Sequence, residues 1–198
     1  MLRRLKSDKS IIADLPEKNV LDYFTNLTTE QAALYAQTLE RLMGELADLE
    51  ARANASPDVE VTNEIVENVF ETDDPAMPAE TSSQSDIRAK RRGLVLRLIT
   101  ALKQICNSPS QYLKTDEPRP DSGKAAALLE LLARCRDADR KVLVFTQFRR
   151  MGELLQHWIE RETGMRPDFL HGGVSRTGRQ AMVDRFQTDR SARVLIVS

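Results

Sequence analysis

The chain has few cysteines and no long apolar run. Its 198 residues include only two cysteines, Cys106 and Cys135, which lie far apart in the sequence. Because the Cys and His ligands of structural zinc usually come in close pairs, this spacing argues against a metal site. No apolar run approaches the ~20 residues that a membrane-spanning helix needs, and the basic start is not followed by the apolar core of a secretory signal. We therefore expect a cytoplasmic protein whose two cysteines are reduced and serve as small, buried apolar side chains.

Basic residues are absent from one long segment. Residues 53–86 contain no Lys or Arg, but nine acidic residues and three prolines. We interpret this segment as a mobile, disordered acidic insert with one short helix at 63–70, because like charges repel and few apolar groups are available for packing. Residues 1–86 carry a net charge of −11 and residues 87–198 carry +10. This division indicates either a second half that binds a polyanion or two ordinary solvated surfaces.

A complete phosphate-binding loop is also missing. Ser122-Gly123-Lys124 resembles the end of the pattern GxxxxGK[ST], but Pro118 occupies the first glycine position and Ala125 the hydroxyl position. Ala125 cannot ligate magnesium and Pro118 has no amide for a phosphate, so we reject a Walker A site. No acidic pair follows an apolar strand, which also excludes a Walker B magnesium site.

The first half of the sequence is mainly helical. Residues 19–27 alternate apolar and polar side chains, which predicts a half-buried strand. A capping box from Thr28 to Gln31 then starts a helix that fades near Asn54. A second helix is predicted over residues 86–107, with its apolar face formed by Leu94, Leu98, Ile99, Leu102 and Ile105.

The second predicted helix opens with a basic cluster. Arg88, Lys90, Arg91 and Arg92 lie within five positions. These side chains either contact nucleic acid or pair with the preceding acidic insert. We favour pairing slightly, because attachment in one chain gives the two segments a high effective concentration. The helix ends at Asn107-Ser108-Pro109, since the residue before a proline avoids helical geometry.

Residues 123–198 have the pattern of an α/β domain. After a helix at 123–136, the apolar strand KVLVFTQF, a helix, a short strand, a Gly-Gly turn, a helix and the strand RVLIVS follow. This β-α-β-α-β order predicts a parallel sheet with flanking helices. A doubly wound sheet has more strands than these, so we expect the domain to be truncated.

The ends of these strands supply the candidate ligand-binding residues. Thr146 and Gln147 are polar, uncharged residues at the end where open α/β sheets bind ligands. Gly172 and Gly173 precede a helix that contains Arg176 and Arg179, which suits a phosphate at a helix N-terminus. Alternatively, the glycines only make a tight turn and the arginines only face water. His171 has no nucleophile at a suitable spacing, so we reject it as a general base, and His157 and Trp158 belong to a helix face or the core.

Five sequence blocks in a fixed order resemble one family. They resemble consecutive blocks of the SWI/SNF-type helicase-like ATPases of superfamily 2, especially the bacterial branch. The blocks are LRRLKSDKSIIADLPEK, ALKQICNSP, SGKAAALLELL, KVLVFTQF and FLHGGVSRTGRQAMVDRFQ. Many members of the family have His before Pro where this chain has Ser108-Pro109, which bears only on local packing.

The resemblance implies a two-lobed motor that uses ATP and Mg to move on double-stranded DNA. Residues 1–109 would be the end of the first lobe and a helical insertion, and residues 110–122 would be a linker. Residues 123–198 would be the first half of a second RecA-like lobe, the helicase C-terminal domain. The resemblance implies that Thr146, Gln147, Gly172, Gly173 and Arg179 contact the DNA backbone independently of the DNA sequence. It assigns no catalytic residue and no metal ligand to this chain.

We therefore expect a fragment of a nucleoid-associated DNA translocase that binds no cofactor by itself. Whether the chain is an enzyme stays open, because the Walker motifs and the arginine fingers of the family are not among its residues. Its partners would be duplex DNA and separately supplied helicase segments. The alternatives are a catalytically inactive DNA- or protein-binding module and a non-functional gene remnant.

Overall fold

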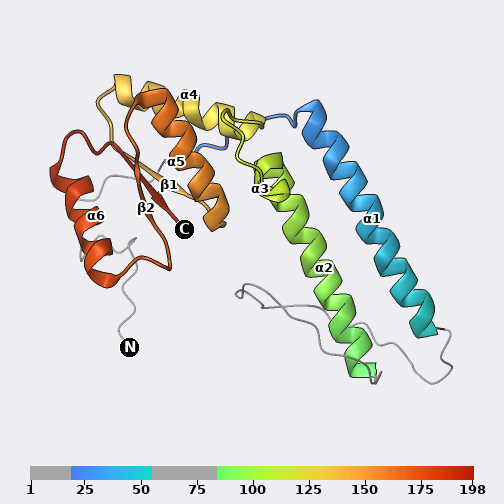
Figure 1. The fold of residues 1–198 in the computed structure, drawn as a ribbon. Coiled ribbons are helices and arrows are strands. Elements are labelled where there is room, and N and C mark those ends of the chain that lie inside the picture. The colour runs from blue at the N-terminus through green and yellow to red at the C-terminus, as the bar shows by residue number, and fades with distance from the viewer. Residues whose placement is uncertain (1–18, 55–83) are drawn as a thin grey trace.

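Two long helices form an arm that projects from a small α/β unit (Figure 1). The structure, a computed structural model, describes residues 19–54 and 84–198. Helices α1 (Thr29–Asn54) and α2 (Gln84–Asn107) lie side by side and antiparallel along the arm. The predicted acidic insert and its short helix lie outside the described residues, except that residues 53–54 and 84–86 belong to α1 and α2.

The capping box at the start of α1 is confirmed. Thr28 Oγ1 accepts a hydrogen bond from the Gln31 backbone N–H at 3.1 Å, and Gln31 Oε1 accepts one from the Thr28 N–H at 3.0 Å. Buried Gln31 also donates through Nε2 to the carbonyl of Ile105 at 2.8 Å. One side chain therefore starts α1 and joins it to the last turn of α2.

The apolar face predicted for residues 86–107 is confirmed except at one position, since Leu94, Leu98 and Leu102 are half-buried and Ile105 is buried. Leu42 of α1 and both Ala101 and Ile105 of α2 are buried between the helices. Ile99, assigned to the same face, is 46% exposed. It follows Leu98 by one residue, which turns it about 100° around the helix and away from α1.

The strand predicted at residues 19–27 is wrong. This segment has no regular hydrogen bonding, and Leu21 and Phe24 are 92% and 91% exposed. A strand needs a neighbouring strand to bond with, and the described sheet lies elsewhere. Apolar alternation alone therefore did not suffice to predict a strand here.

A polar joint connects the arm to the α/β unit. Helix α3 (Pro109–Leu113) follows α2 directly and is capped by buried Ser108. The Asp121 carboxylate accepts hydrogen bonds from Ser108 Oγ at 2.6 Å and from the Ser110 N–H at 2.7 Å. Ser108 thus has a structural role at the joint. Part of the segment predicted as a linker is helical.

The α/β unit contains a three-stranded parallel sheet in the order β1-β3-β2. The elements are α4 (Gly123–Asp137), β1 (Val142–Phe145), α5 (Arg149–Thr163), β2 (Asp168–Leu170), α6 (Arg176–Thr188) and β3 (Val194–Val197). The sequence predicted this order correctly. Because β3 lies between β1 and β2, right-handed crossovers place α5 and α6 on opposite faces of the sheet.

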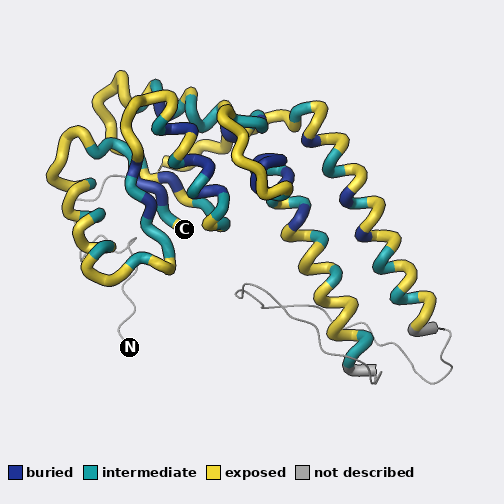
Figure 2. The backbone as a smooth tube through the Cα atoms, viewed as in Figure 1, coloured by how far each residue is buried: buried dark blue, intermediate teal, exposed yellow. Residues whose placement is uncertain are grey.

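The main core lies on the face of the sheet that α4 and α5 cover (Figure 2). Val144, Phe169 and Ile196 of the three strands pack there against buried side chains of α5, including Trp158. Trp158 also donates a hydrogen bond from Nε1 to the Glu117 carbonyl at 2.8 Å. Trp158 is thus a core residue, as expected, while His157 on the same helix is exposed.

Neither cysteine is fully buried, which corrects the sequence expectation. Both are free and half-buried, because the buried positions beside them are taken by Ile105 and Leu132. No cluster of His, Cys, Asp or Glu among the described residues could hold a metal ion. Within the described ranges, no helix is long and apolar enough to cross a membrane.

Candidate nucleic-acid interface

The residues predicted to bind a ligand lie along one edge of the sheet. Parallel strands bring Thr146 and Gln147, which follow β1, to the same edge as the turn that follows β2. The ladder continues past the strands, since the Thr146 N–H donates to Val197 and the Ser198 N–H donates to Leu170, each at 2.9 Å. Thr146 and Gln147 lie on one side of β3 and the Gly172-Gly173 turn lies on the other. The two groups are therefore roughly 10 Å apart, which is the distance of two strand spacings. The structure therefore groups them along one edge without direct contact.

Thr146 and Gln147 form the link from β1 to α5. Thr146 Oγ1 accepts a hydrogen bond from the Phe148 N–H at 3.4 Å, which turns the chain into the helix. Gln147 is exposed, with no hydrogen bond among the described residues. Phe148 provides no side-chain cap for α5, so the first-turn amides of this helix lack a side-chain acceptor.

The turn after β2 is stabilised by His171, and the space beside Gly172 is unoccupied by other atoms of the described residues. His171 Nδ1 accepts a hydrogen bond from the Gly173 N–H at 3.1 Å, and the imidazole packs on Phe169 with 4.8 Å between ring centroids. Neither Gly172 nor Gly173 has a positive φ. A methyl group on Gly172 would meet no atom within 4 Å. The backbone conformation does not explain Gly172, whereas close approach of a ligand would.

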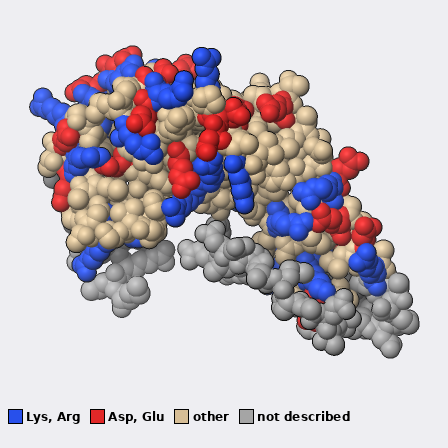
Figure 3. Space-filling view, viewed as in Figure 1, with Lys and Arg blue, Asp and Glu red and all other residues tan. Residues whose placement is uncertain are grey.

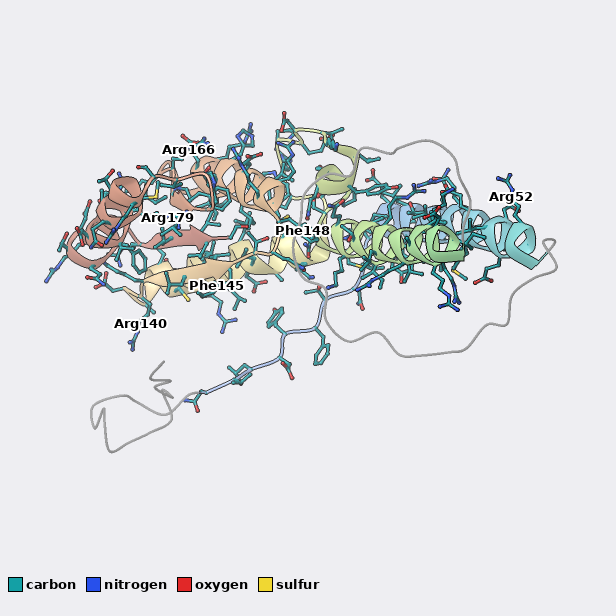
Figure 4. All side chains as sticks on the ribbon, turned by 90° about the horizontal axis from the view of Figure 1, so that it is seen from below. Arg52, Arg140, Phe145, Phe148, Arg166 and Arg179 are labelled. Atoms are coloured by element: carbon teal, nitrogen blue, oxygen red, sulfur yellow. The ribbon has the colours of Figure 1, made fainter. Side chains whose placement is uncertain are left out.

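Arg179 fixes this turn from the first part of α6. Its Nε donates to the Val174 carbonyl and its Nη2 to the Gly172 carbonyl, both at 2.9 Å. These bonds use two of the five guanidinium N–H groups, so three donors remain. Arg179 is exposed and is marked in Figure 4. The contact of Arg179 with DNA stays a prediction. The structure adds that Arg179 also stabilises the turn after β2.

Two further arginines lie at the same edge: Arg176, which belongs to the basic helix start predicted after the Gly-Gly turn, and Arg149, which the sequence patterns did not single out. Arg149 begins α5, and its Nη1 would lie 3.8 Å from a methyl group on Gly173, so it reaches from the β1 side to the turn after β2. Arg176 begins α6 and is exposed, without an ion pair among the described residues. The signal for Arg149 was available, because this residue lies at the start of the predicted helix that follows the strand KVLVFTQF.

A groove of about 850 Å³ extends the candidate edge toward the arm. It is lined by Thr146 and Gln147 on one side and by α2 and α4 on the other, with Lys103 and Lys124 among its residues. β1 runs from Arg140 toward Phe148, so its carboxyl end faces the arm (Figure 4). The groove places two further cations beside Thr146 and Gln147.

The two edges of the sheet differ in electrostatics. The N-terminal ends of α5 and α6 lie at the candidate edge, where the helix dipole is positive and attracts anions. The opposite edge has a cavity of about 570 Å³ with six arginines, which face the negative C-terminal ends of α4, α5 and α6. Hydrogen bonds from Ser191 lower the pKa of Asp189 there, and Lys141 and Arg185 act in the same direction. Cations and acids are interleaved in Figure 3, so no single-sign surface covers the visible face.

The sequence Ser122-Gly123-Lys124 has a structural role. Ser122 Oγ accepts from the Ala125 N–H and donates to the Asn107 carbonyl, which ties α4 to the end of α2. Lys124 Nζ donates to Asn107 Oδ1 at 3.0 Å. A methyl group on Gly123 would lie 2.4 Å from the Asn26 carbonyl oxygen, so only glycine fits. These contacts account for all three residues without a phosphate.

Comparison with known proteins agrees with this geometry. Residues 123–198 match the family described as Helicase conserved C-terminal domain. The putative ATP-dependent helicase/translocase YwqA of Bacillus subtilis is 30% identical over 190 residues, which is 94% of this chain and 17% of that protein.

Two solved structures from Sulfolobus solfataricus are similar in fold. The SWI2/SNF2 ATPase core in complex with dsDNA has a TM-score of 0.69 and 30% identity, covering 100% of this chain and 34% of that one. The SWI2/SNF2 ATPase C-terminal domain has a TM-score of 0.66 and 27% identity, covering 89% of this chain and 61% of that one. The chain thus spans less than a fifth of the Bacillus relative and about a third of the archaeal core. It belongs to the SWI/SNF-type helicase-like ATPases, and its α/β unit is the RecA-like helicase C-terminal domain of that family.

Proposed function

We propose that this chain provides the DNA-backbone contacts of the second lobe of an ATP-driven double-stranded DNA translocase. The observation that carries the proposal is the convergence, at one edge, of Thr146, Gln147, the open Gly172-Gly173 turn and the N-terminal ends of α5 and α6. The similarity to an ATPase core determined with dsDNA supports duplex DNA as the ligand.

The chemistry of this edge suits phosphate and not bases. Its donors are backbone amides, a hydroxyl, an amide side chain and arginines, which bind phosphate oxygens without reading sequence. Arg149 and Arg176 add positive charge, and Arg179 holds the turn while keeping three donors available. Binding would therefore be independent of sequence and strongly dependent on salt.

We further propose that this chain does not hydrolyse ATP by itself. A phosphoryl-transfer site needs a phosphate loop, a magnesium carboxylate and a group that stabilises the transition-state charge. Ser122, Gly123 and Lys124 are used in structural contacts. ATP and Mg would be bound with the other segments of a two-lobed motor, and the expected location is the nucleoid.

The direct test is duplex binding across a salt series. We expect the logarithm of affinity to fall linearly with the logarithm of salt concentration, as displaced counterions require. The double variant Arg149→Gln/Arg176→Gln should make the slope less steep by about 2, one for each lost phosphate contact. Arg166→Gln/Arg190→Gln is the matched control, since it also removes two exposed arginines but at the opposite edge.

Four outcomes of the binding and ATP-turnover measurements have different meanings. No binding at low salt would overturn the DNA proposal, and an equal effect of Arg166→Gln/Arg190→Gln would overturn the assignment of the edge. Magnesium-dependent ATP turnover by the pure chain, stimulated by duplex DNA, would contradict the absence of an ATPase site. DNA binding without turnover would agree with both parts of the proposal.

A further inference from the structure

The face of α2 that points away from α1 is exposed and has a mixed apolar and basic character. Val95, Leu96 and Ile99 are 36%, 41% and 46% exposed there. Helical spacing puts Arg88 and Arg92 on the same face toward the tip of the arm, and Lys103 toward its base. We call this surface, formed by Arg88, Arg92, Val95, Leu96, Ile99 and Lys103, the outer α2 face. At its base, Ile99 and Lys103 also line the groove beside Thr146 and Gln147.

The charges on this face are not used by the described structure. Arg91 and Arg97, which point toward α1, form ion pairs with Glu50 and Glu45. Arg88, Arg92 and Lys103 form neither an ion pair nor a side-chain hydrogen bond with any part of the chain that the structure describes. The outer face therefore combines free positive charge with exposed apolar side chains.

The sequence next to α2 has the complementary composition. Residues 87–115 contain seven Lys or Arg and no acid, whereas residues 55–83 contain eight acids and no Lys or Arg. The acidic segment also carries large apolar residues between its acids, at Val59, Val61, Ile65, Val66, Val69 and Phe70. Two blocks of opposite charge, each with apolar residues, thus follow one another directly in the chain.

We propose that residues 55–83 dock on the outer α2 face. An acidic segment with apolar residues matches this face better than DNA does. Its apolar residues can bury the apolar side chains of α2, whereas the phosphates of DNA gain nothing from apolar contact. Alignment of eight acids with the cations of α2 gives complementary charge, and apolar contact removes exposed surface from water.

The connection to both helices makes this docking sterically feasible. Residues 55–83 begin where α1 ends and finish where α2 begins. From Arg88 to Lys103 the outer face is roughly 23 Å long at the rise of an α-helix. Half of the 29-residue segment spans roughly 45 Å when extended, so it reaches the whole face and returns.

Helix α1 gives the segment no comparable surface. It carries five acids, Glu30, Glu40, Glu45, Asp48 and Glu50, and only two cations, Arg41 and Arg52. An acidic segment is repelled by this helix and attracted by α2. The proposal therefore predicts an asymmetry between two helices that are equally close to the segment along the chain.

Paramagnetic relaxation in the full chain tests this asymmetry. One spin label is attached at Leu96→Cys and, in a separate sample, another at Met43→Cys, both with Cys106→Ser and Cys135→Ser. The two positions are similarly exposed, at 41% and 47%, and lie 12 and 11 residues from the segment-bearing ends of their helices. We expect the label at 96 to broaden amide signals of residues 55–83 several-fold more than the label at 43. Equal broadening from both labels would overturn the proposal.

Two further measurements test whether charge causes the docking and whether the docked segment belongs to the same chain. Arg88→Gln/Arg92→Gln, or raised salt, should remove most of the extra broadening, while unchanged far-UV circular dichroism confirms that α2 is intact. Insensitivity to both would contradict the charge complementarity. A mixture of spin-labelled chain with isotope-labelled chain without the spin label should show no broadening of residues 55–83. Broadening in that mixture would assign the face to a second copy and overturn docking within one chain.

Discussion

The two-helix arm and the α/β unit bury different kinds of side chains. Among the residues that the structure describes, eleven of the fourteen buried apolar residues belong to residues 123–198, and only Leu42, Ala101 and Ile105 belong to the arm. The six buried polar residues within the described ranges show the opposite distribution, since all of them precede residue 123. They are Gln31, Thr38, Ser108, Ser110, Gln111 and Ser122.

This difference shows that the two regions are held together by different interactions. The α/β unit depends on a contiguous apolar core, whose stability scales with the apolar area removed from water. The arm and the joint depend on directed hydrogen bonds to the ends of helices, which fix orientation but contribute little net energy each. Substitutions should therefore affect each region through the interaction that dominates it.

Trp158→Ala should have the largest effect on stability. The indole is 1% exposed within the core, and its Nε1 bonds to the Glu117 carbonyl. Removing it should lower the free energy of unfolding by about 3–5 kcal/mol through lost burial and a residual cavity. Urea denaturation followed by far-UV circular dichroism measures this loss. A loss below about 1 kcal/mol would mean that the core of the α/β unit is loosely packed around Trp158.

Glycine-to-alanine substitutions should have opposite signs in the two regions. A methyl group on Gly152 of α5 would lie 2.1 Å from the Phe169 ring, whereas one on Gly93 of α2 would meet nothing within 4 Å. Gly152→Ala should cost about 1–3 kcal/mol through overpacking, partly offset by better helix propensity. Gly93→Ala should stabilise by about 0.5–1 kcal/mol, since propensity acts alone. Melting curves that shift in the same direction for both variants would refute this contrast.

Gln31→Ala should weaken the arm without disturbing the sheet. It removes the reciprocal cap at Thr28 and leaves the Ile105 carbonyl without its 2.8 Å partner. We expect a cost of about 1–2 kcal/mol from the lost cap and the unsatisfied acceptor. Hydrogen exchange should become faster in α1 and α2 but not in β1 and β3. Uniformly faster exchange would indicate that the two regions unfold as one.

The sequence predicted the parts of the fold that depend on local rules. The capping box at Thr28, the stop at Pro109 and the alternation of strands and helices after residue 123 were all confirmed. Each follows from backbone hydrogen bonding or periodicity over a few residues. The strand at 19–27 failed because pairing depends on a distant neighbour, which alternation cannot supply.

Predicting the candidate interface from the sequence was possible for positions but not for roles. Strand ends located Thr146, Gln147 and the Gly172-Gly173 turn at one edge, because parallel strands must end together. The sequence could not show that Arg179 bonds to two backbone carbonyls or that Arg149 reaches Gly173. These roles depend on side-chain directions, which sequence spacing does not determine.

The ion pair between Arg91 of α2 and Glu50 of α1, one of two between the described residues of these helices, should have the smallest effect. Arg91 and Glu50 approach to 3.0 Å, but their side chains are 53% and 46% exposed. Solvent screens such a pair, so a double-mutant cycle with Arg91→Ala and Glu50→Ala should give a coupling of about 0.2–1 kcal/mol. The coupling should shrink as salt rises through the range where the Debye length falls below about 10 Å. A coupling near 2 kcal/mol that does not respond to salt would mean that electrostatics, and not the Gln31 bonds and three buried apolar residues, holds the arm together.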